Sequence, residues 1–318
     1  MIITVTPNPS IDRAYQVPAL RIGEVNRAGS THVDAGGKGI NISRALSNND
    51  IPTTAVFPCG GADGLQLVAL LDADRLSTVP VPVSDAIRSN ITLVDEAGIT
   101  TKVNAPGPTV SEDEVEALLA AVDRTASTGS GWLVGAGSLP AGAPVDFYVR
   151  LAAIARKYGL PLALDTSGAP LAAAVAAGGL GLIKPNEEEL AELLGQELRT
   201  VGEITQGSRH LMASGIDAVL VSLGAGGALL IDQHHTWWAG GPPLVPLSTV
   251  GAGDTTLAGF LATTGTSSRQ LHEAVVWGRA AVLLPGTAAP HPRHLDRGAV
   301  TVVADPSPRL TLKELCQP

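Results

Sequence analysis

Short apolar runs alternate with amphipathic stretches along most of the chain, and this alternation most constrains the fold. The apolar runs have the length of buried strands and fall at residues 2–6, 53–57, 132–135, 160–164, 181–183, 218–222 and 228–231. Helical patterns lie between them, at residues 39–48, 111–127, 145–158, 186–194 and 204–214. Buried strands separated by helices form a mostly parallel sheet with helices on both faces. We therefore predict an α/β fold with one central sheet.

Two regions interrupt the alternation, because they are rich in strand-forming residues but contain no helical pattern. They span residues 12–34 and about 79–104. In the second region, residues 89–95 and 99–103 predict a hairpin that turns at 96–98. We expect the two regions to form a small β lid over the main sheet, within a single domain of residues 1–318. The edges and apolar faces of such a lid also predict a homodimer in which two lids pair.

Composition and charge exclude several classes of protein. No stretch reaches the ~18 uninterrupted apolar residues that a membrane span needs, and residues 1–10 lack the features of a signal peptide. Two cysteines do not support a disulfide framework. The formal net charge of −9 disfavours nonspecific nucleic-acid binding. We expect a cytoplasmic protein with neither a membrane nor a nucleic acid as partner.

The segment 248–256 (STVGAGDTT) places two glycines and an aspartate directly before an apolar helical stretch. Glycines let bare N–H groups approach a ligand, and the start of a helix favours an anion. A carboxylate in the same turn would be repelled by a phosphate. Asp254 is therefore either an ordinary helix cap or a base that takes a proton from an attacking hydroxyl. The segment alone does not decide between these readings.

A second glycine cluster, 34–41 (DAGGKGIN), opens another predicted helix. It is not a P-loop, because Gly39 stands where that motif requires Ser or Thr. It is either a tight turn with a solvated lysine or a sugar site to which Lys38 and Asn41 contribute polar contacts.

Three further loops follow predicted strands, at 135–140 (GAGSLP), 184–189 (KPNEEE) and 222–227 (SLGAGG). Ligands of open α/β sheets bind beyond the carboxyl ends of the strands, where these loops would lie. The acids of 184–189 favour a helix start through the helix dipole alone, or hold Mg²⁺ through waters. One such loop is weak evidence of a site, whereas five at the strand ends of one sheet are much stronger.

Together the motifs resemble those of the PfkB, ribokinase-like family of carbohydrate kinases. They occur in the family's order, as GGKGxN at 36–41, GxGSLP at 135–140, KPNxxE at 184–189, SLGxxG at 222–227 and TVGAGD at 249–254. The resemblance covers residues 1 to about 290 and implies a ribokinase-like fold. Within the family, TPNPSID (6–12), GEVNR (23–27) and RSN (88–90) are most similar to the 1-phosphofructokinases, with the tagatose-6-phosphate kinases as near neighbours.

The resemblance assigns a role to each matching residue. Asp254 would be the catalytic base, and the anion hole for the transferred phosphoryl group would include Gly251, Ala252 and Gly253. The sugar hydroxyls would be held by Asp12, Gly37, Lys38 and Asn41. The phosphate already on the sugar would contact Arg27, Arg88, Asn90 and Ser138. ATP would contact Lys184, Asn186, Ser222, Gly224 and Gly227. Mg²⁺ would bind through water to Asn186 and Glu189.

The activity implied by the resemblance is ATP-dependent phosphorylation of fructose 1-phosphate to fructose 1,6-bisphosphate. A tagatose-6-phosphate or fructose-6-phosphate kinase would use the same residues, and a non-catalytic sugar-phosphate sensor could share the fold. Trp277 and Arg279 stand where the family usually has small residues near adenine, which leaves the phosphoryl donor open. Residues 285–292 resemble a family segment that implies a monovalent-cation loop.

Overall fold

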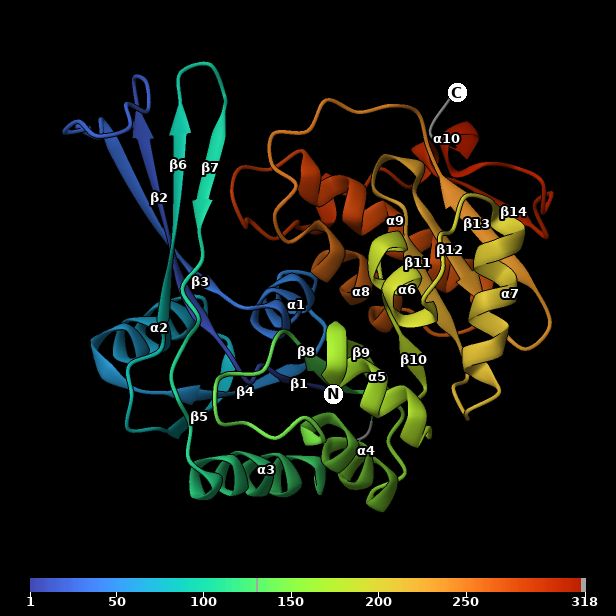
Figure 1. The fold of residues 1–318 in the computed structure, drawn as a ribbon, viewed down its shortest axis with the longest axis horizontal. Helices are drawn as coiled ribbons and strands as arrows, with labels where there is room; N and C mark the ends of the chain where they lie inside the picture. The colour runs from blue at the N-terminus through green and yellow to red at the C-terminus, as the bar shows by residue number, and fades with distance from the viewer. Residues whose placement is uncertain (130, 316–318) are drawn as a thin grey trace.

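A computed structural model of the chain describes residues 1–129 and 131–315, which form two β-sheets and their covering helices (Figure 1). The larger sheet has ten strands. In spatial order they are Thr301–Ala304 (β14), Thr236–Gly240 (β13), Ala228–Ile231 (β12), Val219–Ser222 (β11), Leu182–Ile183 (β10), Leu162–Asp165 (β9), Leu133–Ala136 (β8), Ile2–Val5 (β1), Thr53–Cys59 (β4) and Ser77–Pro82 (β5). Pairing is parallel from β5 to β11 and antiparallel from β11 to β14. The prediction of a mostly parallel sheet is confirmed.

Helices cover both faces of this sheet, because neighbouring residues of each buried strand enter different cores. Ile3 belongs to one core cluster and Ile2 to another. The first cluster is covered by α3 (Glu112–Ala126), α4 (Phe147–Lys157), α5 (Gly168–Ala177), α6 (Glu187–Leu194) and α7 (Val201–Met212). The second is covered by α1 (Lys38–Ser47), α8 (Ala252–Ala262) and α9 (Ser267–Val282). A third cluster joins α2 (Gly61–Ala73) to β4 and to the smaller sheet. At the end of the described chain, α10 (Leu312–Leu315) packs against the first cluster.

The smaller sheet has four strands, β3 (Ser30–Gly36), β2 (Ser10–Val17), β6 (Arg88–Asp95) and β7 (Thr100–Val103), in that spatial order. It stands beside the larger sheet, at the left of Figure 1. The strands β6 and β7 pair antiparallel, as the predicted hairpin requires. The chain passes through this sheet twice. It first enters β2 from β1 and leaves β3 into α1, and it later enters β6 from β5 and leaves β7 into α3.

One part of the predicted lid lies elsewhere. Residues 79–82 belong to β5, which pairs parallel with β4 at the edge of the larger sheet. Pro80 and Pro82 lack backbone donors, and an edge strand tolerates them because one of its sides carries no partner.

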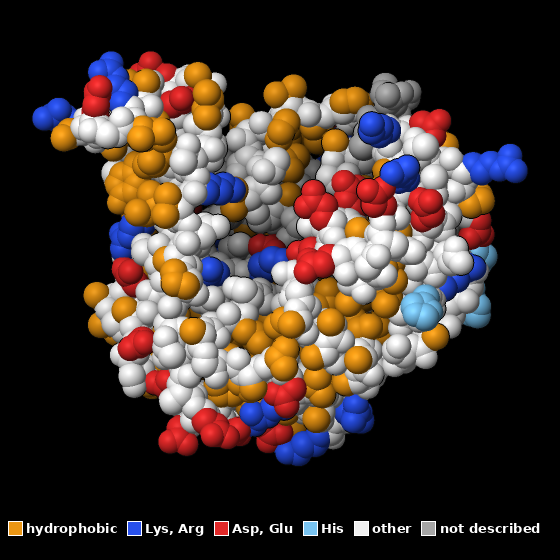
Figure 2. Space-filling view, viewed as in Figure 1, with side chains coloured by type: hydrophobic (Ala, Val, Ile, Leu, Met, Phe, Trp, Pro, Cys, Tyr) orange, Lys and Arg blue, Asp and Glu red, His pale blue; other side chains and the backbone are white. Residues whose placement is uncertain are grey.

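The space-filling view shows a hollow between the smaller sheet and the helices of the main body (Figure 2). Basic and acidic side chains gather on its walls. None of the helices within 1–129 and 131–315 combines the length and apolar character needed to cross a membrane.

Candidate active site

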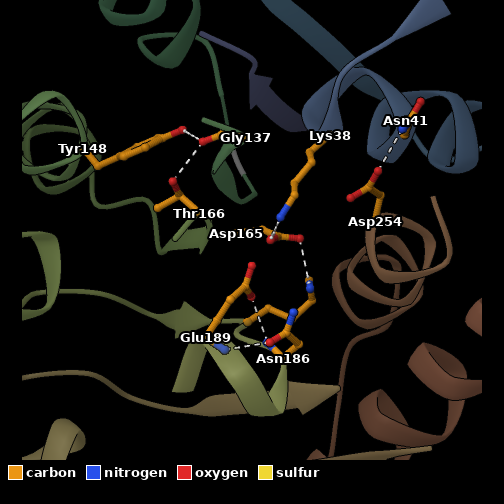
Figure 3. A network of polar contacts seen from close by, with 10 residues as sticks. Lys38, Asn41, Gly137, Tyr148, Asp165, Thr166, Asn186, Glu189 and Asp254 are labelled. Atoms are coloured by element: carbon orange, nitrogen blue, oxygen red, sulfur yellow. Dashed lines mark hydrogen bonds and ion pairs between the residues drawn. The ribbon is translucent and has the colours of Figure 1, made fainter. Parts of the chain in front are cut away.

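Asp254 lies in the first turn of α8, and the backbone before it bends to start that helix. Gly251 caps α8 in the left-handed conformation, with φ of 75°, which glycine adopts without strain. The first N–H groups of an α-helix have no acceptor within the helix, so this turn presents free donors. The Asp254 side chain is only 7% exposed, and Asn41 Nδ2 of α1 donates to its Oδ2 at 2.8 Å (Figure 3). A turn with N–H donors outside the helix ladder and a buried carboxylate therefore share one helix start.

The surroundings of Asp254 make its carboxylate more basic than usual. Burial is the largest cause, and the negative charge of Asp165 adds to it, so that together they raise the pKa of Asp254 to about 6. The hydrogen bond from Asn41 and the charges of Lys38 and Lys184 act in the opposite direction. A carboxylate with this pKa is mostly ionised at neutral pH and still accepts a proton more readily than an exposed aspartate.

The side chains of two lysines flank Asp165, which lies at the carboxyl end of β9. Lys38 Nζ donates to its Oδ1 at 2.7 Å, and Lys184 Nζ lies 3.0 Å from its Oδ2. Burial alone would raise the pKa of Asp165, but the charges of Lys184 and Lys38 outweigh it and hold that pKa below its ordinary value. Burial would likewise lower the pKa of Lys38, and Asp165 reverses this effect and raises it. Two cations are thus fixed beside the start of α8.

Asp165 was missed in the sequence, although it directly follows the predicted strand 160–164. A carboxylate at the carboxyl end of a parallel strand was the available signal. Lys184 also lies beside the start of α8. A Cβ placed at Gly253 would be 3.4 Å from the Lys184 Nζ.

Two predicted substrate-binding residues of the smaller sheet, Asp12 for the sugar hydroxyls and Asn90 for the phosphate, lie together. Asp12 Oδ1 accepts hydrogen bonds from Ser10 Oγ at 2.8 Å and from Asn90 Nδ2 at 2.9 Å. The bonds arise because Asp12 and Asn90 are directly paired on β2 and β6. Gly36 faces the same carboxylate, and any side chain there would overlap it. Asp12 and Asn90 therefore form one polar pair, and Asn90 Oδ1 has no hydrogen-bond partner within the described residues.

Arg88 is held in place by main-chain carbonyls at the junction of the two sheets. Its guanidinium donates to Asn8 O at 3.0 Å and to Ala105 O at 3.3 Å. Burial lowers the pKa of Arg88, and Asp12 opposes that effect. Its Nε is buried without a partner among the residues described. A fixed cation with an unused donor is suited to a phosphate oxygen.

Ser138 lies in a loop that internal hydrogen bonds hold in place. The carbonyl of Gly137 accepts from Tyr148 Oη at 2.7 Å and from Thr166 Oγ1 at 2.9 Å (Figure 3). Ser138 itself is exposed, and its Oγ accepts from Asn8 Nδ2 at 3.3 Å. Asn8, which lies in the TPNPSID motif but was given no role there, thus links this loop to Arg88.

Asn186 and Glu189 form a capping box at the start of α6. Asn186 Oδ1 accepts from the N–H of Glu189 at 2.7 Å, and Glu189 Oε2 accepts from the N–H of Asn186 at 2.9 Å. These two residues therefore stabilise the start of the helix, which is one of the two roles that the sequence left open; the other was Mg²⁺ binding. The second carboxylate oxygen of Glu189 is left for a further contact. Within 1–129 and 131–315, no group of three or more His, Cys, Asp or Glu side chains could hold a metal ion by itself.

The loop after β11 is shaped by glycines. Gly224 and Gly227 have positive φ, and a side chain at Gly227 would overlap a carbonyl of β13. Ser222 pairs with Asn186 in an isolated bridge, so this loop and the start of α6 are neighbours.

Arg27 is the predicted site residue that the structure does not bring to the others. It lies in the exposed connection between β2 and β3, and no described residue makes a hydrogen bond or ion pair with its side chain. The connection follows Val17 at the end of β2, whereas Arg88 is paired with Ser10 at the start of that strand. Within one chain Arg27 and Arg88 are therefore apart, and the role of Arg27 in a phosphate site stays a prediction.

Residues 6–287 match the model of the pfkB family of carbohydrate kinases. The chain belongs to this family. As a pfkB kinase it is a phosphotransferase with an alcohol group as acceptor, and the resemblance drawn from the five motifs is confirmed.

Relatives of this pfkB kinase include two kinds of phosphofructokinase. The 1-phosphofructokinase of Rhodobacter capsulatus is 37% identical over 265 residues, which cover 82% of each chain. The ATP-dependent 6-phosphofructokinase isozyme 2 of Escherichia coli is 34% identical over 291 residues, 90% of this chain and 94% of the relative. The crystal structure of Escherichia coli phosphofructokinase-2 in complex with potassium aligns with a TM-score of 0.86 at 32% identity, over 92% and 96% of the two chains. The ribokinase-like fold is thereby confirmed.

Proposed function

We propose that this pfkB kinase transfers the terminal phosphoryl group of ATP to O6 of fructose 1-phosphate, with Asp254 as general base. The observation that carries the proposal is the buried carboxylate of Asp254 in the turn that presents the N–H groups of α8. A group that accepts a hydroxyl proton beside donors for a phosphoryl group is what in-line transfer to an alcohol requires.

Each neighbouring group has a part in this reaction. Asp254 takes the proton from O6 as that oxygen attacks phosphorus, and Asn41 orients the carboxylate through its hydrogen bond. The N–H groups at residues 251–254 donate to the transferred oxygens, while Lys38 and Lys184 offset their negative charge. Asp12 binds sugar hydroxyls, and the phosphate at C1 is bound by the fixed guanidinium of Arg88 and by the neighbouring Asn90.

The proposed magnesium site fits the side chains present. Mg²⁺ binds proteins through one or two carboxylates and otherwise through waters and substrate phosphates. Glu189 has one carboxylate oxygen outside its capping box. Glu189 would hold the ion through water, with Asn186 beside it. Neutralisation of phosphate charge is the chemistry that bound magnesium supplies.

A monovalent cation near residues 285–292 remains part of the proposal. One relative was solved in complex with potassium. In this chain the carbonyls of Thr287, Ala289 and Pro290 accept bonds from Arg44, Asn48 and Asn49 of the α1 region, so a cation there would need other carbonyls.

We further propose that the smaller sheet is a lid, that two lids pair in a homodimer, and that the protein works in the cytoplasm. Every strand residue of β6 is only half-buried and all of β7 is exposed, so this sheet has surface left for a second copy. Light scattering on the purified protein tests the dimer, and a monomer at micromolar concentration would contradict it.

The assay that tests the function is an ATP-coupled measurement with fructose 1-phosphate, fructose 6-phosphate, tagatose 6-phosphate and fructose. We expect the highest kcat/KM with fructose 1-phosphate. A preference for fructose 6-phosphate would support a fructose-6-phosphate kinase, the activity named for one relative, a 6-phosphofructokinase. A preference for tagatose 6-phosphate would support a tagatose-6-phosphate kinase.

The Asp254→Asn variant tests the base directly. Turnover should fall by roughly a thousandfold, while both substrates still bind. Near-normal turnover would remove Asp254 from the role of base. If the unaltered protein binds sugar phosphate but transfers nothing from ATP, it is a sensor, a reading that its intact Asp254, Asn186 and Glu189 disfavour.

A further inference from the structure

Asn8 is a polar residue buried at the junction of the two sheets. It lies in the connection between β1 and β2, is only 3% exposed, and is flanked by Pro7 and Pro9. A proline fixes its own φ and restricts the backbone of the residue before it. The main chain around Asn8 is therefore stiff, which holds its side-chain amide and its carbonyl in fixed directions.

The side-chain amide of Asn8 joins two other segments of the chain. Its Nδ2 donates to Pro106 O at 3.0 Å and to Ser138 Oγ at 3.3 Å, which uses both of its hydrogens. Gly107 lies against the same amide, because any side chain there would overlap Asn8 Oδ1, and its φ of 97° favours glycine. The amide is thus enclosed between the segment 105–107 and the loop that carries Ser138.

The main chain of Asn8 holds Arg88 in the same arrangement. Arg88 is the first residue of β6, and it donates to Asn8 O at 3.0 Å and to Ala105 O at 3.3 Å. Ala105 directly precedes Pro106, so both carbonyls belong to segments that Asn8 joins. These segments run between the smaller sheet and the main body (Figure 1). Asn8 therefore determines where Arg88 lies relative to Ser138.

The hydrogen bonds of Asn8 leave Ser138 and Arg88 with donors to spare. Ser138 Oγ accepts from Asn8, and its own hydroxyl hydrogen makes no bond to another residue that the structure describes. Arg88 Nε is likewise buried without a partner within 1–129 and 131–315. A phosphate offers several acceptor oxygens and a negative charge, so these two donors match it.

We propose that Asn8 is a positioning residue that makes the kinase select a phosphorylated sugar over an unphosphorylated one. It fixes the separation of Arg88 and Ser138, and it leaves the hydroxyl hydrogen of Ser138 for the phosphate. Asn8 itself contacts neither the sugar nor the reacting atoms. This role rests on the proposed function, because it requires the phosphate of the sugar to bind Arg88 and Ser138. It holds whichever of the tested sugar phosphates is the substrate.

Two variants at position 8 test this role through a ratio, that of kcat/KM for the preferred sugar phosphate to kcat/KM for fructose. Asn8→Asp keeps the shape of the side chain, but a carboxylate cannot donate to Pro106 O and accepts the Ser138 hydrogen that the phosphate needs. Asn8→Ala removes the amide altogether. Each should lower the ratio roughly tenfold, the size of one hydrogen bond to a charged group. Calorimetric titration with the sugar phosphate alone should show the same loss of affinity.

Gln270→Ala is the matched control. The Gln270 amide also donates to a main-chain carbonyl, that of Thr263, but it does so at the opposite end of α8 from Asp254. Loss of such a bond lowers Tm in all three variants, so Tm does not separate the two roles of an asparagine here. The ratio does, and Gln270→Ala should leave it unchanged. A merely structural Asn8 would lower kcat/KM for both sugars by the same factor, and that result would overturn the proposal.

Arg88→Ala separates failure of this role from failure of the proposed function. If Arg88→Ala lowers the ratio and both Asn8 variants leave it unchanged, the phosphate binds at Arg88 but Asn8 does not position the site. If Arg88→Ala leaves the ratio unchanged as well, the proposed phosphate site is wrong and the role of Asn8 with it. In a Ser138→Ala background, Asn8→Asp should lower the ratio less than it does alone, because the hydroxyl through which it acts is absent. An equal effect in that background would overturn the link through Ser138.

Discussion

Replacing Asp254 with asparagine should stabilise the fold while it removes activity. The carboxylate is buried, and its pKa of about 6 stands against an ordinary value of 3.8. Each pKa unit corresponds to about 1.4 kcal/mol, so ionised Asp254 costs the folded state about 3 kcal/mol above pH 7. Asparagine has the same shape, carries no charge and can still accept the hydrogen bond from Asn41.

The direction in which the stability difference changes with pH follows from the raised pKa of Asp254. Because the pKa of Asp254 is higher in the folded than in the unfolded chain, the folded chain binds the proton more tightly between about pH 4 and 6. Stability from this group therefore falls as the pH rises through that window. The free energy of unfolding of Asp254→Asn should exceed that of the unaltered protein by roughly 1 to 2 kcal/mol more at pH 5 than at pH 3, and by about 3 kcal/mol more at pH 7.5 than at pH 3.

Urea denaturation at several pH values measures this difference. Asp217→Asn is the matched control, because Asp217 is exposed and its change should alter stability little at any pH. If Asp254→Asn is no more stable than the unaltered protein at pH 7.5, a buried, costly charge at Asp254 is refuted. If the variant gains stability equally at every pH, a cause other than ionisation is responsible.

Three further predictions concern the site and its loops. The acid limb of the kcat/KM profile should lie near pH 6, because burial and the charge of Asp165 raise the pKa of Asp254. Asp165→Asn should move this limb to lower pH, and an unchanged limb would contradict the electrostatic effect of Asp165 on Asp254. Arg88→Ala should raise KM for fructose 1-phosphate at least roughly tenfold and leave KM for fructose almost unchanged, and equal effects would remove Arg88 from the phosphate site. Gly227→Ala should lower the urea midpoint, with a loss of at least about 1 kcal/mol, because its side chain would overlap a carbonyl. Gly224→Ala is its control, because φ is positive there but the space is open, and equal losses would show that only φ matters.

The sequence predicted the fold wherever a local signal agreed with burial. Ser111 and Glu114 form the expected capping box of α3, and the strands buried on both faces were visible as apolar runs. The helix α5 was not predicted, because alanine occupies most of its positions and gives no helical period. The strand β5 was assigned to the lid, because two prolines in six residues obscure its pairing with β4.

The site could be predicted only as far as its motifs are continuous in sequence. The glycines that start α8 were visible, whereas the role of Asp165 depends on two lysines that only the fold brings to it. Arg27 shows the opposite limit. Its motif matched the family, but nothing local to the sequence revealed that β2 carries it away from Arg88.

The smaller sheet is joined to α1 through a single residue, so the proposed lid and the helix that carries Lys38 and Asn41 are directly coupled. Only Gly37 separates β3 from α1, and its φ of 118° excludes most other residues. A side chain there would also approach Thr6 Cγ2 to 2.8 Å, so the joint is tight as well as strained for any replacement. Rotation of the sheet must therefore pull on the first turns of α1, which carry Lys38 and Asn41. Asn41 is the hydrogen-bond donor to Asp254, so movement of the proposed lid would lengthen that bond and raise the pKa of Asp254. The proton affinity of the proposed base would then report how far the lid has closed.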